Sequence, residues 1–459
     1  MMKNVADDSK ALQVASFGIR GYVGETLEPA VVIDFASAFA TFKEGGRILL
    51  GRDTRYSSPM LHAAVVSGLL SAGCEVLDFG ICPAPMLQFS VRSYDASGAV
   101  AISGGHNAMG WNAVTLISND GAYLEPVGGE TVLDIFHSGD FLKRDWQGLG
   151  SIASVDNFDE AYFDALEGFI DAAAIRNANF TVLIDPAGGA GCSYLEPFAR
   201  RFGFNLVPIN AEPSGYLARE AEPRPRSARL MASTISYLNG NVGFVLNSDM
   251  SRMSLVSETA ESASEEYTFA MIANHVLSKI TGPVVTNCCT TNMIDYIADR
   301  SNVPVVKTRV GQAYIISALA DEQGIIGGEG SGGVCFPSFS RAFDGFMMMG
   351  LLLEAMAQTG STLSELLDGL PRNHIIKRSV HIGPRDGHLA LEHLEKKWIE
   401  DPAASINYMD GLRIDFEDGW IHARSVRTEQ LVRIISESAN RTVAESRAER
   451  TIRDIEISM

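Results

Sequence analysis

The sequence predicts an α/β protein of three tandem mixed α/β/α sandwich domains followed by a C-terminal α+β domain. Strand-like apolar runs alternate with helix-like segments, which is typical of βαβ units and a largely parallel sheet. This pattern restarts twice along the chain, whereas the last segment contains consecutive strand-like runs. A length of 459 residues is enough for three or four domains.

The predicted elements follow in chain order. In the first domain, residues 1–150, the strands are RILLG, CEVLDFG and GAVAIS, with a helix-like SSPMLHAAVVSGLLSAG after the first. The second domain, 151–258, restarts at FTVLIDPAGGAG, and the third, 259–370, restarts at residues 282–311. Residues 371–459 contain HIIKRSVHIG, LRIDFEDGWIHARSV and LVRIISESA, which predict antiparallel strands with one or two helices.

Composition excludes some function classes. Hydrophobic residues make up 46% and charged residues 20% of the chain, as in ordinary globular proteins. The net charge of −19 argues against a nucleic-acid or membrane partner, although a local arginine cluster can still hold a small anion. The six cysteines lack CxxC spacing, so buried thiols are expected rather than zinc. MMKNVADDSK has no apolar signal core and no run is long enough to span a bilayer, which predicts a cytoplasmic protein.

Two loops of the first domain are candidates for chemistry. AISGGHNAMGWNAV (101–114) presents His106 and Asn107 just after an apolar strand, either as an active-site loop or as an ordinary turn. GRDTRYSS places Arg52 and Asp53 at the carboxyl end of a strand, where ligands bind in open α/β sheets. A salt-bridged surface turn would have the same sequence.

Three later loops carry further candidates. NSDMSR (247–252) offers one carboxylate, one amide and one hydroxyl, which is a poor magnesium site. IIGGEGSGGVCFP (325–337) is a glycine-rich turn whose carboxylate favours sugar hydroxyls over phosphate, although a tight hairpin is the alternative. ARSVRTEQLVRI (423–434) is either an anion cradle or a solvated basic edge.

Taken in this order, the loops resemble the α-D-phosphohexomutase superfamily of archaeal-type phosphoglucomutases, phosphomannomutases and phosphoglucosamine mutases. The similarity covers nearly the whole chain and is strongest at residues 281–315, in GGEGSGGVCFP and in MDGLRIDFEDGWIHAR. The resemblance implies four domains around a central cleft and a first-domain phosphoserine that transfers phosphate to a sugar phosphate. It leaves open a homo-oligomer, because relatives of this type often form dimers or tetramers.

The resemblance also implies which residues form the site. The catalytic positions are Gly105, His106, Asn107, Arg52 and Asp53. The sugar-binding positions are Thr308, Gly328, Glu329 and Ser331, and the phosphate-binding positions are Arg424, Arg427, Thr428 and Arg433. The magnesium positions are Asn247, Asp249 and Ser251, with Arg252 adjacent.

This chain departs from the family pattern where phosphate is transferred. Gly105 occupies the phosphoserine position and cannot carry a phosphoryl group. Asn247 and Ser251 replace two acidic residues, so we expect either no magnesium or a weakly bound ion. In FGIRGYVG, Val23 stands where the family's first-domain motif has an arginine, and Arg20 lies nearby.

The sequence therefore leaves three functions open. The first is a protein that binds a sugar phosphate or a related anionic metabolite without mutase chemistry, acting as a sensor, chaperone or subunit partner. The second is an enzyme with repurposed chemistry that uses His106, Asp53 or Asp249 as acid or base. The third, kept as the alternative, is a conventional magnesium-dependent mutase that interconverts sugar 1- and 6-phosphates.

Overall fold

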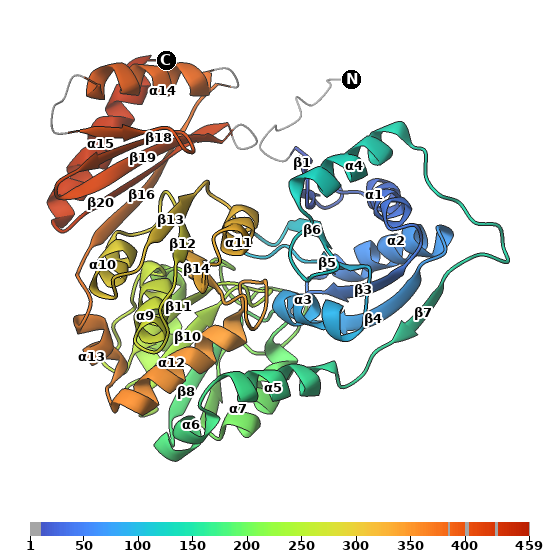
Figure 1. Cartoon of the computed structure of the whole chain (residues 1–459), viewed down its shortest axis with the longest axis horizontal. Coiled ribbons are helices and arrows are strands. Elements are labelled where there is room, and N and C mark those ends of the chain that lie inside the picture. The colour runs from blue at the N-terminus through green and yellow to red at the C-terminus, as the bar shows by residue number, and fades with distance from the viewer. Residues whose placement is uncertain (1–10, 384–385, 400–403, 427–429, 459) are drawn as a thin grey trace.

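The structure is a computed structural model, and it describes residues 11–383, 386–399, 404–426 and 430–458. It confirms the predicted class, with four sheets that define four domains in chain order (Figure 1). Domain I contains β1–β7, domain II β8–β11, domain III β12–β15 and domain IV β16–β20. No helix in these described ranges is both long and apolar enough to cross a membrane.

Domain I is built on a seven-stranded sheet in the order β1-β2-β6-β5-β3-β4-β7. Its strands are β1 Gln13–Ala15, β2 Gly18–Tyr22, β3 Arg47–Arg52, β4 Glu75–Ile81, β5 Gly98–Ile102, β6 Trp111–Ile117 and β7 Ser151–Ser154. Its helices are α1 Pro29–Phe42, α2 Ser58–Ser71, α3 Ala84–Ser93 and α4 Pro126–Ser138.

The prediction of a largely parallel sheet is wrong for half of this sheet. Strands β3, β4, β5 and β7 are parallel to one another, but β6 pairs antiparallel with both β5 and β2. The reason is the short connection from β5 to β6, because a parallel crossover needs a dozen or more residues. The sheet also extends past the predicted boundary at residue 150, since the exposed strand β7 forms its edge beside β4.

Domains II and III each have a four-stranded sheet, ordered β11-β10-β8-β9 and β13-β12-β14-β15. The strands of domain II are β8 Thr181–Asp185, β9 Asn205–Pro208, β10 Val242–Leu246 and β11 Met253–Ser257. Its helices are α5 Phe158–Phe169, α6 Ala172–Ala178, α7 Leu195–Phe202 and α8 Arg229–Thr234, with 3-10 turns at Cys192–Tyr194 and Pro225–Ala228. The strands of domain III are β12 Val284–Asn287, β13 Val305–Thr308, β14 Ile326–Glu329 and β15 Gly333–Cys335. Its helices are α9 Glu266–Leu277, α10 Met293–Arg300, α11 Gln312–Asp321, α12 Gly345–Thr359 and α13 Leu363–Asp368.

Domain IV is an antiparallel sheet ordered β16-β20-β19-β18-β17, covered by two helices, as predicted. Its elements are β16 His374–His381, α14 Asp386–Trp398, β17 Ser405–Asn407, β18 Leu412–Phe416, β19 Gly419–Val426, β20 Leu431–Ser438 and α15 Arg441–Ser458.

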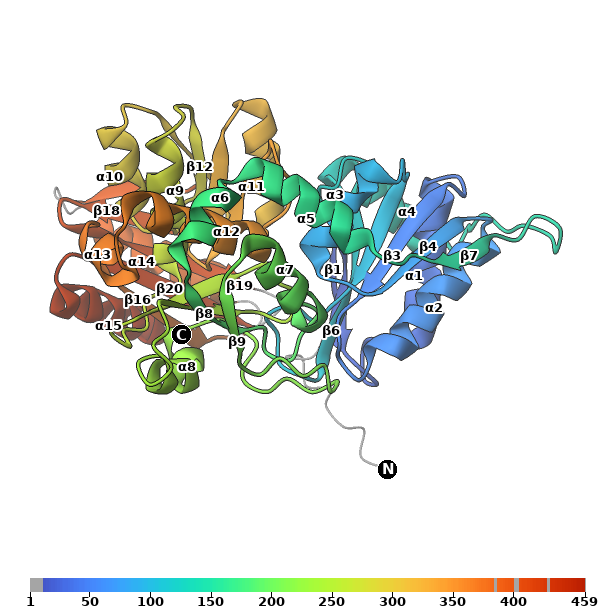
Figure 2. The same ribbon diagram turned by 90° about the horizontal axis from the view of Figure 1, so that it is seen from below.

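The hydrophobic core joins three of the domains and leaves the fourth separate. One cluster runs from the α3 face of domain I through domains II and III, with Phe163, Phe198 and Phe346 packed ring to ring. Domain IV has its own cluster. In Figure 2 the chain crosses from domain I to domain II between β7 and α5. Apolar packing therefore fixes domains I–III together, whereas domain IV meets them through other contacts.

Candidate ligand-binding cleft

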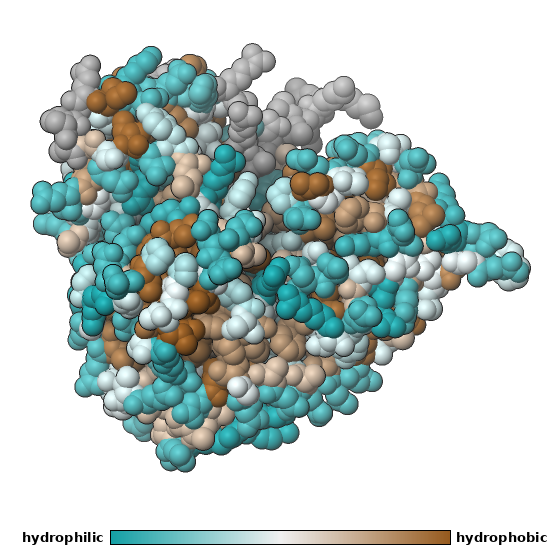
Figure 3. Space-filling model, in the orientation of Figure 1, coloured by the Kyte–Doolittle hydropathy of each residue, from teal (hydrophilic) through white to brown (hydrophobic). Residues whose placement is uncertain are grey.

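A cleft of about 800 Å³ is lined by residues of all four domains. Figure 3 shows the surface hollowed between domain IV and domain I, with a largely hydrophilic rim. Six cationic side chains line the cleft against three carboxylates, although the whole chain is acidic. The cations are Arg20, Arg224, Arg252, Lys377, Arg378 and Arg433, and the carboxylates are Glu222, Glu266 and Glu329. A wall of this composition attracts a multiply charged anion of small-molecule size.

The predicted active-site loop connects β5 to β6, and Arg55 holds it in place. Arg55 is fully buried and donates to the carbonyls of Gly105, Asn107, Ala108 and Trp111 at 2.7–3.2 Å. The planar fork of guanidinium donors suits this arrangement of carbonyls, which an ammonium could not match. The loop brings His106 and Asn107 into the cleft wall.

Asp53 lies beneath this loop and does not line the cleft. Its carboxylate accepts hydrogen bonds from Arg55 Nε at 3.1 Å, Ser103 Oγ at 2.9 Å and the Gly104 amide at 3.1 Å. Arg52 also lies outside the cleft wall, and it donates to the Asp53 carbonyl at 3.2 Å. The geometry therefore makes Asp53 a positioning residue for the loop.

Gly105 adopts a left-handed conformation with φ of 54°. A Cβ atom at this position would lie 3.0 Å from Oδ2 of Asp249, so the loop of domain I abuts the predicted metal loop of domain II. The Gly105 carbonyl accepts a hydrogen bond of 2.7 Å from Ser248 Oγ. Gly105, which the resemblance places at the phosphoserine position, thus carries no nucleophile, and a side chain added there would press against Asp249.

The predicted metal loop is closed on itself by hydrogen bonds. Asn247 Oδ1 accepts from the amides of Ser251 at 2.9 Å and Arg252 at 3.0 Å. Asp249 Oδ1 accepts from the Ser251 amide at 3.0 Å and the Ser251 hydroxyl at 2.6 Å. Across the described chain there is no group of three or more His, Cys, Asp or Glu side chains placed to hold a metal. The loop has one carboxylate, and its amide and hydroxyl groups are already hydrogen-bonded within the loop. This arrangement does not fit Mg²⁺, which prefers several free oxygen ligands.

The pKa of His106 reports the charge of this end of the cleft. The positive charge of Arg252 lowers it well below its usual value, with further contributions from burial and from Arg20, Arg433 and Arg224. His106 is therefore neutral at physiological pH, so it can accept a proton or a hydrogen bond but does not supply a positive charge.

Two of the four residues predicted to bind sugar lie in the cleft wall. Glu329 and Ser331 line the cleft between β14 and β15, where Glu329 accepts from Arg252 at 3.3 Å and from Asn287 at 3.2 Å. A glycine at position 330 leaves room for the Glu266 carboxylate, which would have to move if residue 330 carried a Cβ. The other two predicted residues lie behind the wall: Thr308 donates to the Arg309 carbonyl, and the Gly328 carbonyl accepts from Thr286.

Of the residues predicted to bind phosphate, one lines the cleft and one does not. Arg433 on β20 lines the cleft, whereas Arg424, opposite it on β19, lies outside the wall and pairs with Asp410 at 3.5 Å. The predicted residues Arg427 and Thr428 lie outside the described residues. Arg20 of domain I lines the cleft, whereas Val23, which the resemblance places at the arginine position of the first-domain motif, does not.

The sequence reasoning missed several cleft residues. Lys377 and Arg378 sit on β16, whose pattern indicated only an antiparallel strand, and Glu222 and Arg224 lie in the loop after β9. Lys377 joins domain IV to domain III, since its ammonium contacts Glu265 at 2.7 Å, Glu266 at 2.9 Å and the Gly330 carbonyl at 3.0 Å. The only signal for the second pair was a charged, proline-rich EPRPR in a predicted loop.

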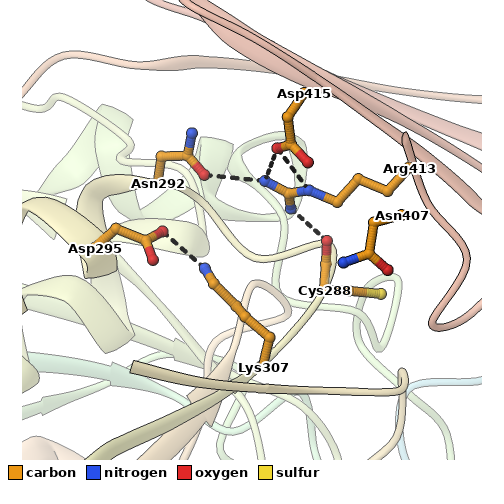
Figure 4. A pocket seen from close by; sticks show the side chains of 7 residues that line it. All are labelled: Cys288, Asn292, Asp295, Lys307, Asn407, Arg413 and Asp415. Carbon is orange, nitrogen blue, oxygen red and sulfur yellow. Dashed lines mark hydrogen bonds and ion pairs between the residues drawn. The ribbon is translucent and has the colours of Figure 1, made fainter. Parts of the chain in front are cut away.

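A smaller cavity of about 330 Å³ lies where domain III meets domain IV (Figure 4). Arg413 pairs with Asp415 at 2.7 Å, donates to the Cys288 carbonyl and stacks 4.4 Å from the Trp420 ring centre. Lys307 pairs with Asp295 at 2.7 Å across the same cavity. Arg413 of domain IV also donates to Asn292 Oδ1 of domain III at 3.2 Å, so its hydrogen bonds to Cys288 and Asn292 make this cavity a polar joint between the domains.

Three domain families match the chain, and together they cover most of its length. Residues 12–143 match phosphoglucomutase/phosphomannomutase, alpha/beta/alpha domain I. Residues 160–260 match alpha/beta/alpha domain II of the same group, and residues 264–374 match alpha/beta/alpha domain III.

Individual proteins match along almost the whole chain. A phosphoglucomutase/phosphomannomutase of Thermococcus kodakarensis is 34% identical over 96% of this chain and 98% of its own length. A probable phosphoglucosamine mutase of Pyrococcus abyssi is 32% identical over 95% and 97%. Among solved structures, a phosphoglucomutase/phosphomannomutase family protein of Burkholderia thailandensis superposes with a TM-score of 0.83 at 21% identity, covering 98% of both chains. The N-acetylphosphoglucosamine mutase of Aspergillus fumigatus in complex with GlcNAc-6P and magnesium superposes with a TM-score of 0.61 at 14% identity, covering 98% of this chain and 96% of its own.

Proposed function

Because the chain belongs to the phosphoglucomutase/phosphomannomutase family of the α-D-phosphohexomutase superfamily, we propose that its cleft binds a hexose phosphate or hexosamine phosphate. The observation that carries this proposal is the excess of cationic over acidic side chains in the cleft of a chain with net charge −19. Glu329 and Ser331 supply the acceptor and hydroxyl groups that a sugar requires. The structural neighbour from Aspergillus fumigatus, which was solved with GlcNAc-6P, supports this ligand class.

The names of the relatives favour the conventional mutase reaction on this ligand over binding alone. Both curated relatives are named as mutases, and they cover 95% or more of this chain. Interconversion of sugar 1- and 6-phosphates is therefore the first activity to test.

Gly105 favours a second candidate, which is sugar-phosphate binding without phosphate transfer through the protein. A mutase that works through a phosphoserine needs a hydroxyl at this position, and the nearest loop hydroxyl is committed elsewhere, because Ser103 Oγ donates to Asp53 and accepts from the Gly105 amide. Repurposed acid–base catalysis by Asp53 has less support, since hydrogen bonds from the loop occupy its carboxylate.

One experiment separates these candidates. The purified chain is titrated calorimetrically with glucose, mannose and glucosamine 1- and 6-phosphates, with and without magnesium, and each mixture is followed by ³¹P NMR. Conversion between 1- and 6-phosphates supports the mutase, and binding without conversion supports the binding protein. The Glu329→Gln variant is the matched test of the cleft, with an expected loss of about tenfold in affinity. If none of the six compounds binds, the proposal is overturned.

A further inference from the structure

Two arginines of domain II stand side by side in the cleft, bridged by one carboxylate. Glu222 pairs with Arg224 at 2.5 Å and with Arg252 at 3.8 Å. Arg20 of domain I lines the same cleft and contacts Gln13 Oε1 at 3.0 Å. Within the described residues, the buried Nε atom of Arg224 has no hydrogen-bond acceptor. The Arg224 side chain as a whole is 39% exposed and lines the cleft, so a ligand there can reach its guanidinium group.

The neighbouring loop has lost negative charge. With carboxylates at positions 247, 249 and 251, the loop would carry three negative charges, and a divalent cation would be needed before an anion could approach. Asn247 and Ser251 are neutral, so the loop carries only the charge of Asp249. Removing two carboxylates changes the local charge by +2, which is the charge that a divalent cation would have added.

We propose that Arg20, Arg224 and Arg252 form a metal-free phosphate subsite at the Gly105 end of the cleft. The fixed guanidinium groups supply the positive charge there without a bound cation, and Glu222 holds two of them in register. Guanidinium groups bind phosphate through paired charge-assisted hydrogen bonds. The subsite rests on the proposed function in so far as its phosphate belongs to the sugar ligand. The low pKa of His106 is consistent with the same excess of positive charge.

Inorganic phosphate is the probe, because it tests the subsite without requiring sugar recognition. Calorimetric titration in EDTA compares the wild-type chain with Arg224→Gln, which should bind at least tenfold more weakly. Arg226→Gln is the matched control. Arg226 lies two residues away, pairs with Glu220 and does not line the cleft, so this variant should bind as the wild type does.

Arg433 is a second arginine that could hold phosphate, so the titrations are repeated in an Arg433→Gln background. The proposed subsite should survive Arg433→Gln and be lost on adding Arg224→Gln. Arg224→Lys keeps the charge and should retain part of the affinity. A thermal melt of each variant establishes that it is folded.

Asn247→Asp combined with Ser251→Asp restores two carboxylates to the loop next to the subsite. This double variant should bind phosphate at least tenfold more weakly in EDTA and recover affinity when magnesium is added. Equal phosphate affinity of wild type and Arg224→Gln, or phosphate binding by the wild type only with magnesium, would overturn the inference. Arg224-dependent phosphate binding without binding of any sugar phosphate would overturn the proposed function alone.

Discussion

A fully buried arginine, Arg55, determines the shape of the loop that carries His106. Its charge is matched by the nearly buried Asp53 at 3.1 Å, and its remaining donors meet loop carbonyls. Removing one partner of such a pair leaves an uncompensated buried charge. The arginine therefore stabilises the fold and positions the loop at the same time.

Arg55→Ala should lower the free energy of unfolding by about 3–5 kcal/mol, because it leaves Asp53 buried without its partner. Urea denaturation followed by circular dichroism measures this. Arg52→Ala is the control, since Arg52 is only partly buried and makes one backbone hydrogen bond, and it should cost less than about 1 kcal/mol. Equal losses for both variants would show that the buried network is not what holds the loop.

Gly105→Ser should not restore mutase turnover, because the predicted metal loop also keeps only one carboxylate, Asp249. The serine would also be strained by the left-handed φ of 54° and pressed against Asp249, at a cost of about 1–2 kcal/mol. ³¹P NMR and thermal unfolding check the two effects. Gly139→Ser has a similar φ of 69° but open space around it, so it isolates the backbone cost from the contact with Asp249. Substantial conversion by Gly105→Ser alone would refute this expectation.

Glu354 makes stability depend on acid pH. Burial alone would raise its pKa, but hydrogen bonds from His275, Lys279 and the Asp171 amide hold it at about 2. Since the folded pKa lies below the unfolded value, the contribution is full above about pH 4.5 and is lost as pH falls toward 2. As the pH is lowered from 6 to 2, the melting temperature of the wild type should fall more steeply than that of Glu354→Gln. Parallel curves would contradict this assignment.

At the scale of elements, local sequence patterns predicted strands and helices better than they predicted pairings. The strands of RILLG, CEVLDFG and GAVAIS are β3, β4 and β5, because continuous apolar runs mark strands buried on both faces. The sequence did not reveal that β6 turns back antiparallel or that β7 belongs to the first sheet, since both depend on contacts between distant segments.

The same limit separates the cleft residues that the sequence predicted from those that it did not. His106, Glu329 and Arg433 were predicted because each lies in a recognisable loop or strand end, and each lines the cleft. Arg224 and Lys377 were not predicted, because nothing local to EPRPR or to β16 shows that the fold carries them into the same cavity.

The joint between β18 and the loop after β12 should govern how firmly domain IV docks. Arg413→Met removes the Asp415 pair, the hydrogen bond to the Cys288 carbonyl and the contact with Trp420. We expect faster proteolytic cleavage near residues 370–374 and a loss of about 2–4 kcal/mol. Arg450→Met is the matched control, because Arg450 stacks on Trp398 within domain IV at 4.6 Å and should leave cleavage there unchanged. Unchanged cleavage in Arg413→Met would show that the joint does not control docking.

At the scale of the whole molecule, the division of the hydrophobic core predicts two cooperative units. A continuous apolar cluster joins domains I–III, and a buried hydrogen bond of 2.7 Å from Tyr162 on α5 to Asp344, the N-cap of α12, adds to it. The core of domain IV is separate, and the contacts across its boundary described above, from Lys377 to Glu265 and from Arg413 to the Cys288 carbonyl, are polar. Ligand groups held by Arg433 and by Glu329 would therefore bridge two units.

Hydrogen exchange followed by mass spectrometry should show β16–β20 opening as one unit, with less protection than the strands of domains I–III. A saturating sugar phosphate should raise the protection of domain IV more than that of α5 or α7, which lie far from the cleft wall. Uniform protection across all four sheets would instead show a single cooperative unit.

The edge strand β7 has a consequence for handling the protein. Its four residues, SIAS, are exposed and uncharged, and an open strand edge of this kind is a template on which another chain can add a strand. Only its short length limits such pairing, because four residues offer few hydrogen bonds to an incoming segment. A variant with a longer β7 would therefore aggregate at this edge. An example is a chain in which β-prone residues lengthen the connection to α5.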